Sequence, residues 1–106
     1  MRVVSQNGNV DLPYEKIDVC HATENVVALH NEKQYVLGSY SSQEKAYKAM
    51  EMLREQYSRI RIIKALASGT CEHMEKSLKP EEFKDILEEY ISMEAFQFPQ
   101  DNEIEV

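Results

Sequence analysis

The sequence has no tryptophan, three glycines, three prolines and two cysteines, and it has no long run of apolar residues. A helix that crosses a bilayer needs about 20 consecutive apolar residues, so no membrane association is expected. The first residues lack the apolar core and cleavage site of a signal peptide. Two cysteines are too few for a disulfide scaffold. These absences predict a cytoplasmic protein with reduced thiols.

The sequence also lacks the common catalytic motifs. Its glycines, Gly8, Gly38 and Gly69, are isolated, so no glycine-rich phosphate loop is present. It contains neither a G-x-S-x-G nor an H-E-x-x-H pattern, which would indicate a hydrolase nucleophile or a zinc protease. We therefore expect a protein that is not an enzyme and that uses no cofactor.

Charge is distributed unevenly along a chain of 106 residues with a formal net charge of −7. Residues 41–64 carry six basic and three acidic side chains, whereas residues 79–106 carry two basic and nine acidic ones. Phosphate backbones repel such a protein, so direct binding to nucleic acid is not expected. The acidic third can instead attract a basic protein surface.

Period-two patterns and turn residues predict a β meander over residues 1–40. Asn7-Gly8 predicts a tight hairpin with both residues at positive φ, and Pro13 should end its strand or lie on an edge. The expected strands are residues 1–5, 10–12, 17–22, 26–29 and 34–40. Short connections between them favour one antiparallel sheet.

A helical pattern follows the strands. Ser41 and Glu44 fit a capping box, and apolar residues at helical spacing predict a helix from Ser42 to about Ser58. Residues 59–67 fit either a strand or a helix. A short helix is expected at 71–78 and another from Pro80 to near Met93.

Residues 96–99 are expected to be extended, because the residue before proline avoids the α region, and residues 101–106 are expected to fray. The chain is thus predicted to be a single α+β domain. Residues 1–40 form a small antiparallel meander sheet, residues 41–95 a helical part with two or three helices packed on one face, and residues 96–106 an extended acidic tail.

Two Cys-His groups raise the question of a metal site. Cys20-His21 and Cys71-Glu72-His73 supply enough ligands for zinc, but adjacent strand residues point to opposite faces. The spacing therefore favours no metal, with Cys20 buried as a small apolar side chain and His21 on the surface.

Two groups of charged residues are candidates for binding. Arg54, Tyr57, Arg59 and Arg61 could hold a nucleotide, because arginine suits phosphate and tyrosine can stack on a base; the favoured alternative is that they are solvated charges at a helix end. The acidic candidates for a protein interface are Glu81, Glu82, Asp85, Glu88, Glu89, Asp101 and Glu103. A run of this kind is usually a solvated face.

Three segments, MRVVSQNGNVDLPYE, YSSQEKAYKAMEMLREQY and FQFPQDNEIEV, resemble a family of small proteins from phages and prophages of Firmicutes. The shared motifs are MRVxSQxG…PYE, YSSxEKAxKAMEMLR and FxFPxDxE, and residues 59–91 carry no resemblance. The resemblance implies a phage accessory protein, and such proteins often counter host defence.

Two anti-defence forms fit different parts of the chain. An acidic inhibitor of a host defence protein, such as a CRISPR effector nuclease, is the first interpretation, because it requires an acidic surface. An oligomeric sponge for a cyclic nucleotide immune signal, similar to the Thoeris anti-defence sponges, is the second, and it would use the basic group. A phage accessory protein with a structural role is the third. All three act by stoichiometric binding, and the partner is either a host protein or its nucleotide signal.

Overall fold

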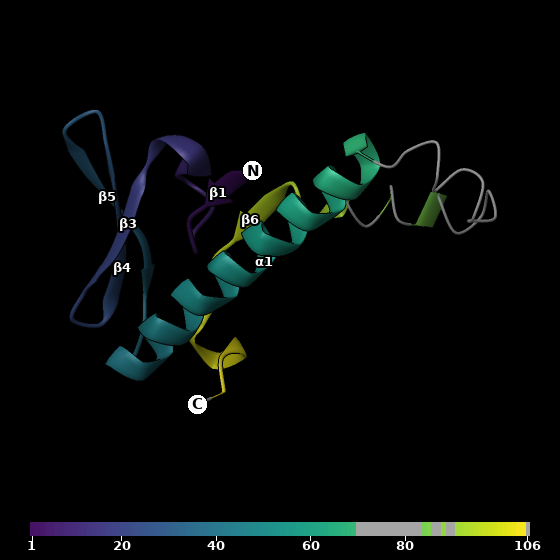
Figure 1. Ribbon diagram of the computed structural model, residues 1–106. Coiled ribbons are helices and arrows are strands. Elements are labelled where there is room, and N and C mark those ends of the chain that lie inside the picture. Colours follow the sequence, from purple (N-terminus) through teal and green to yellow (C-terminus); the bar gives the residue numbers. More distant parts are fainter. Residues whose placement is uncertain (70–83, 86–87, 89–90, 106) are drawn as a thin grey trace.

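The computed structural model describes residues 1–69, 84, 85, 88 and 91–105, with the backbone alone described over 66–69. It confirms the predicted α+β class (Figure 1). The elements are β1 (Arg2–Val4), β2 (Asp11–Pro13), η1 (Tyr14–Lys16), β3 (Asp18–Ala22), β4 (Asn25–His30), β5 (Lys33–Ser39), α1 (Gln43–Gly69), β6 (Ala95–Gln97) and η2 (Asp101–Glu103), where η marks a 3-10 helix.

The five predicted strands all exist, but they do not form one meander. Strands β3, β4 and β5 make an antiparallel sheet, whereas β1 lies between β2 and β6 in a second sheet. The pairing of β1 with β6 is parallel and places Val3 opposite Phe96. The single-sheet prediction is wrong because the turn η1 leads the chain from one sheet to the other, and β6 returns from far along the sequence.

The predicted hairpin between β1 and β2 is present, but its turn differs from the expected one. Gly8 has a φ of 79°, whereas Asn7 is outside the left-handed region. The N–H of Gly8 donates to the carbonyl of Ser5 at 2.9 Å. The Asn7 Oδ1 atom accepts hydrogen bonds from Ser5 Oγ at 2.6 Å and from the Asn9 N–H at 3.0 Å. Asn7 therefore holds this loop through its side chain rather than through a positive φ.

The predicted helix is present and longer than expected. Its N-cap is Ser42, whose Oγ accepts from the Lys45 N–H at 3.2 Å. The predicted cap, Ser41, is wrong by one residue, because the Ser41 N–H donates to Asp101 Oδ1 at 2.7 Å. Helix α1 continues to Gly69, so the ambiguous residues 59–67 are helical. No helix in the described part of the chain is long and apolar enough to span a membrane.

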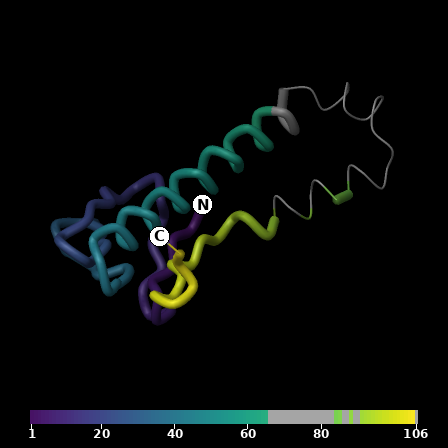
Figure 2. The backbone as a smooth tube through the Cα atoms, turned by 90° about the horizontal axis from the view of Figure 1, so that it is seen from below, coloured from purple at the N-terminus to yellow at the C-terminus, as the bar shows by residue number. Residues whose placement is uncertain are grey.

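Helix α1 runs across both sheets, and its second half extends beyond them (Figures 1 and 2). Ala46 and Ala49 are fully buried and Leu53 nearly so. Small alanines let the helix backbone approach the sheets closely, and Leu53 fills the space next to them. These three residues belong to the main hydrophobic core. Its other members come from both sheets and the final segment: Val3, Leu12, Val26, Ala28, Leu37, Tyr40, Phe96, Phe98 and Ile104.

The final segment closes the core. Of the residues 96–99 predicted to be extended, Phe96 and Gln97 lie in β6. Phe98 donates its N–H to the Val4 carbonyl at 3.0 Å. The expectation that residues 101–106 fray is wrong for the described positions up to 105. Residues 101–103 form η2, and Ile104 is only 4% exposed. Ile104 anchors the tail because its side chain packs in the main core.

Asp101 joins this tail to the start of α1, and its charge should contribute to stability. The hydrogen bond from the Ser41 N–H, aided by Lys45, lowers the pKa of the Asp101 carboxyl. A lowered pKa in the folded state stabilises the protein above the pKa of the unfolded chain, and this contribution is lost as the pH falls through the folded-state pKa. We expect Asp101→Asn to lower the melting temperature at pH 7, and the difference from wild type to shrink below about pH 4.

Thermal melts at both pH values check this expectation, with Asp18→Asn as the matched control. Asp18 is exposed and carries no hydrogen bond or ion pair from its side chain. A melting-temperature difference for Asp101→Asn that stays constant between pH 7 and acid would contradict the proposed role of its charge.

Candidate ligand site at Tyr57

One face of α1 contributes four residues to a cavity of about 280 Å³. Tyr57, Ile60, Arg61 and Lys64 follow the i, i+3, i+4, i+7 spacing that places side chains on one side of a helix. We call this cavity the Tyr57 site. It is lined by Met1, Arg2, Glu15, Tyr57, Ile60, Arg61, Lys64 and Glu94.

Aromatic and apolar groups form part of this site. The ring centroids of Tyr57 and Tyr14 lie 4.5 Å apart, with the planes tilted by 50°. The Arg61 guanidinium carbon is 6.0 Å from the Tyr57 centroid, the outer limit of a cation–π contact. Ile60 is buried and supplies an apolar wall. A ring that enters the cavity would meet Tyr57 with a cationic group beside it.

The charged groups that line the Tyr57 site differ in whether they already have an ion-pair partner. The Arg2 guanidinium forms an ion pair with Asp11, and the amino group of Met1 lies 2.9 Å from Glu15 Oε1. The hydrogen bond from that amino group lowers the pKa of Glu15. Arg61, by contrast, has no carboxylate partner among the residues that the structure describes. Its guanidinium is exposed and available to an anion.

Only two of the four predicted nucleotide-binding residues meet at this site. Arg54 lies beside a neighbouring cavity that Tyr14, Met50 and Leu53 also line. Arg59 lines a third cavity, with Phe96 among its neighbours. A helix turns by about 100° per residue, so Arg59 is on a different face from Tyr57 and Arg61. The four residues therefore do not form one binding site.

Several residues of the Tyr57 site were not among the predicted site residues. Ile60 and Lys64 share the helical face of Tyr57, and extending the periodicity past Ser58 would have found them. Arg2, Glu15 and Glu94 come from other elements, far away in the sequence. No local pattern indicates that they approach α1, because their positions depend on the pairing of β1 with β6.

The predicted acidic interface is divided by the structure. Asp85 and Glu88 are exposed on helical backbone, while Glu81, Glu82 and Glu89 lie outside the described residues. Asp101 and Glu103 are used within the molecule: Asp101 accepts from Ser41, and the Glu103 carboxylate accepts from the Gln100 N–H at 2.9 Å. These last two carboxylates are therefore less available to a partner.

The predicted burial of Cys20 and His21 is reversed. Cys20 is exposed, whereas His21 lies on the helix side of β3, with its ring centroid 4.2 Å from that of Tyr47. Cys20 faces outward because strand residues alternate and Val19 packs against the core. Cys71 and His73 lie outside the described residues. Within the described part of the chain, no three His, Cys, Asp or Glu residues are grouped to hold a metal.

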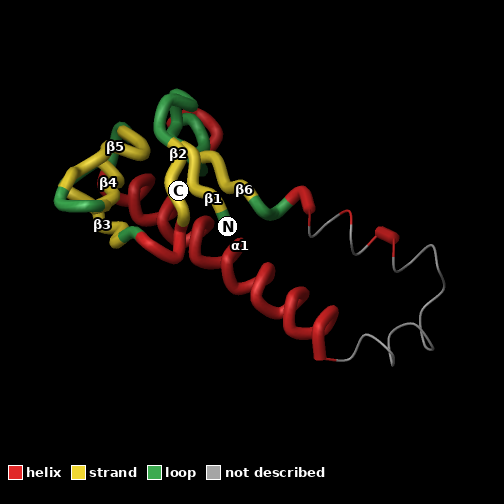
Figure 3. Tube along the Cα trace, turned by 90° about the horizontal axis from the view of Figure 1, so that it is seen from above, coloured by secondary structure: helices red, strands yellow, loops and turns green. Residues whose placement is uncertain are grey.

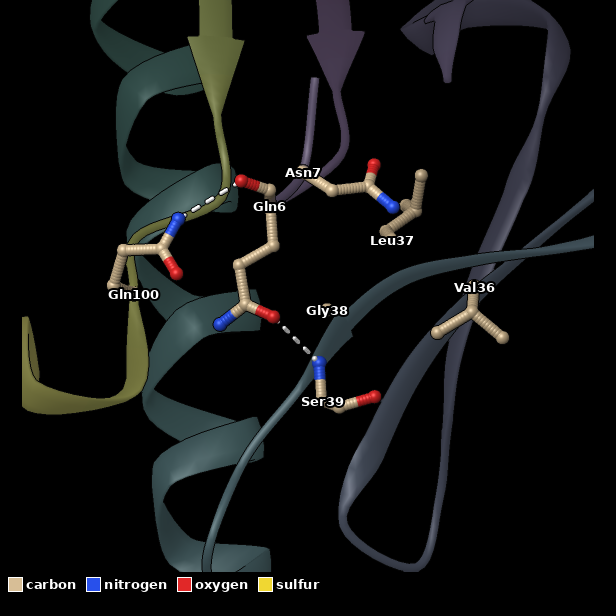
Figure 4. A pocket seen from close by; sticks show the side chains of 7 residues that line it. All are labelled: Gln6, Asn7, Val36, Leu37, Gly38, Ser39 and Gln100. Carbon is tan, nitrogen blue, oxygen red and sulfur yellow. Dashed lines mark hydrogen bonds between the residues drawn. The ribbon is translucent and has the colours of Figure 1, made fainter. Parts of the chain in front are cut away.

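A separate cavity of about 220 Å³ lies where β5 meets the first turn and the final segment (Figure 4). Gln6 crosses it: Gln6 Oε1 accepts from the Ser39 N–H, and Gln6 Nε2 donates to the Pro99 carbonyl, both at 3.0 Å. Gln100 Nε2 donates to the Gln6 carbonyl at 2.9 Å. The side-chain amides of Gln6 and Gln100 thus have hydrogen-bond partners within the chain. We therefore interpret this cavity as a structural junction between the two sheets.

Comparison with known proteins adds no relative. No family model, no curated protein and no solved structure matches the chain. What supports a function is therefore the chemistry of the Tyr57 site and the motifs along the sequence.

Proposed function

We propose that the protein is a phage anti-defence protein that acts by stoichiometric binding and sequesters an anionic cyclic nucleotide signal in the host cytoplasm. The observation that carries this proposal is the Arg61 guanidinium, which has no ion-pair partner among the described residues and lies beside the Tyr57 ring in the Tyr57 site. The resemblance of three segments to small phage proteins supports the anti-defence role.

The two halves of a nucleotide have matching groups in this site. A guanidinium donates two parallel hydrogen bonds to a phosphate. Arg61 forms no ion pair within the described part of the chain, although Glu15 and Glu94 line the same cavity. Tyr57 offers a ring face against which a base can stack, as aromatic side chains do in nucleic-acid binding. Arg2 and Lys64 also line the cavity, with the Arg2 guanidinium held in its ion pair with Asp11.

The size of the cavity limits what it can hold. Its volume of about 280 Å³ lies just below the range of typical ligand pockets, which is about 300–1,000 Å³. One base and one phosphate fit such a space better than a complete cyclic dinucleotide. A larger signal would leave its second half exposed or in contact with another copy of the protein.

Release of a bound nucleotide tests the proposal directly. The purified protein is incubated with an extract of cells whose defence has been triggered, washed and heat-denatured, and the supernatant is analysed by mass spectrometry. The expected result is an intact cyclic nucleotide, in a constant ratio to protein. A supernatant without nucleotide, or catalytic turnover of the nucleotide, would count against sequestration.

Arg61→Ala is expected to weaken binding of the released nucleotide by at least about 10-fold, the loss typical of charged hydrogen bonds. Calorimetric titration measures the affinity. Arg59→Ala is the matched control, because Arg59 is on the same helix but lines another cavity. Equal losses for the two variants would show that general charge, rather than the Tyr57 site, attracts the ligand.

An acidic inhibitor of a host defence protein is the second candidate, and the exposed Asp85 and Glu88 favour it. Here the protein would co-purify with a basic partner such as a nuclease, and salt would weaken the complex. The double variant Asp85→Asn/Glu88→Gln should then reduce co-purification while leaving nucleotide binding unchanged. The opposite pattern supports the nucleotide sponge.

A further inference from the structure

We propose that two copies of the protein pair along β3, in antiparallel orientation, with Cys20 of one copy opposite Cys20 of the other. Strand β3 is an outer strand of the β3–β4–β5 sheet (Figure 3). Its only strand partner among the described residues is β4. An outer strand with unpaired N–H and C=O groups is a template for another strand.

The other outer strands carry features that block such pairing. The Leu37 carbonyl of β5 accepts from the Gln6 N–H at 2.7 Å, so this edge is occupied. Beside β6, Gln56 Nε2 donates to the Ala95 carbonyl at 3.2 Å. Strand β2 is three residues long and ends at Pro13. Strand β3 has neither proline nor lysine, and no hydrogen bond from the rest of the described chain covers its outer edge.

The sequence of β3, Asp-Val-Cys-His-Ala, suits pairing with itself. A two-fold axis at Cys20 places Asp18 opposite Ala22 and Val19 opposite His21. Like charges directly opposite each other destabilise a strand pair, and this register has none. Each copy has a formal charge of −7, and this register places no carboxylate of β3 opposite another.

The outward face of the sheet continues across the proposed junction. Cys20, Val27 and Val36 are register partners in neighbouring strands. Val27 is only 3% exposed although it is not part of the main core, whereas Val36 is 51% exposed. Pairing along β3 would join two such rows into one apolar band across six strands. It would also cover Cys20, which is exposed in the single chain.

A disulfide trap tests the register. Opposed residues in antiparallel strands have Cα atoms about 4.5–5.5 Å apart, within the range that a disulfide bridges. Cys71→Ser chains, which retain Cys20, are treated with copper phenanthroline, which removes two electrons as two thiols lose their protons. We expect a covalent dimer on a non-reducing gel, and none when Cys20→Ser is added.

A second register test uses cysteines at the ends of β3. In the Cys20→Ser/Cys71→Ser background, Asp18→Cys together with Ala22→Cys should cross-link, because these positions face each other across the axis. Asp18→Cys alone should not cross-link, because its counterpart in the other copy is four residues away along the strand. Cross-linking by the single variant would overturn the proposed register.

Light scattering after gel filtration tests whether the pair exists without oxidation. Wild type and Cys20→Ser should have the mass of two chains, while Cys20→Lys, which opposes two ammonium groups, should have half that mass and an unchanged far-ultraviolet circular dichroism spectrum. A monomeric wild type at about 100 µM would overturn the proposal. A dimer in which the two Cys20 residues do not cross-link would also overturn the proposal. Such a dimer could form by face-to-face packing of the two sheets, which are then about 10 Å apart.

This inference does not depend on the ligand of the Tyr57 site. Cys20 is not among the residues that line that cavity, so Cys20→Lys separates assembly from ligand binding at a single chain. If no nucleotide is released but Cys20 cross-links, the proposed function is wrong and the pairing along β3 stands. If a nucleotide is released but Cys20 does not cross-link, the pairing is wrong and the proposed function stands.

Discussion

Phe98→Ala is expected to lower the free energy of unfolding by about 3–5 kcal/mol, the range for removal of a large buried aromatic side chain. Phe98 is 1% exposed. Its ring meets that of Phe96 edge-on, with centroids 5.2 Å apart, a favoured aromatic geometry. Its backbone N–H is fixed to Val4, so the surrounding strands cannot collapse freely into the space left behind. The cavity should therefore persist.

Urea denaturation monitored by circular dichroism measures this loss, and Ile62→Ala is the matched control. Ile62 is 61% exposed on α1, so its replacement should change the free energy of unfolding by about 0.5 kcal/mol or less. A loss below about 1 kcal/mol for Phe98→Ala would contradict its place in the core.

Gly38→Ala is the second large effect, with an expected loss of about 1–3 kcal/mol from overpacking. A Cβ atom at Gly38 would lie 2.9 Å from both Cε2 and Oη of Tyr40. The Tyr40 ring cannot move away cheaply, because it is buried and its hydroxyl donates to the Pro99 carbonyl at 3.0 Å. The same burial raises the pKa of Tyr40. Differential scanning calorimetry gives the change in stability.

A double-mutant cycle identifies the cause of the Gly38 effect. In a Tyr40→Leu background the obstructing ring is absent, so Gly38→Ala should cost less than it does in wild type. Gly8→Ala is the contrasting control. Its cost should come from the φ of 79°, since the nearest side-chain atom is 3.8 Å from the added Cβ, and Tyr40→Leu should not relieve it. An unchanged Gly38→Ala cost in both backgrounds would exclude the clash.

Local patterns in the sequence predicted the elements that depend on local physics. Apolar spacing indicated the face of α1 that buries Ala46, Ala49 and Leu53, and the strands of the β3–β4–β5 sheet were placed within one or two residues. The alternation Arg59-Ile60-Arg61-Ile62 obscured the rest of α1. Of Ile60 and Ile62, only Ile60 is buried. This difference in burial follows from tertiary packing.

Contacts between distant segments were beyond the sequence patterns. Residues 96–99 were expected to be extended, yet nothing local indicates that the strand formed there pairs with β1. The choice between Ser41 and Ser42 as the helix cap also depends on a distant group, because Asp101 occupies the Ser41 N–H. The same limit applies to the ligand site: periodicity places Tyr57 and Arg61 together, but Arg2 and Glu94 join them only after β1 and β6 have paired.

The parallel pairing of β1 with β6 also has a consequence for synthesis of the protein. Gln6 and Pro99, which are joined by a hydrogen bond, lie 93 residues apart in sequence. While the ribosome is still adding residues before Phe96, Val3 has no neighbour on that side, and one flank of β1 stays open. Contacts of such long range slow folding. The nascent chain therefore cannot complete its core until residues 96–104 have left the exit tunnel, and a chaperone that shields β1 should increase the yield.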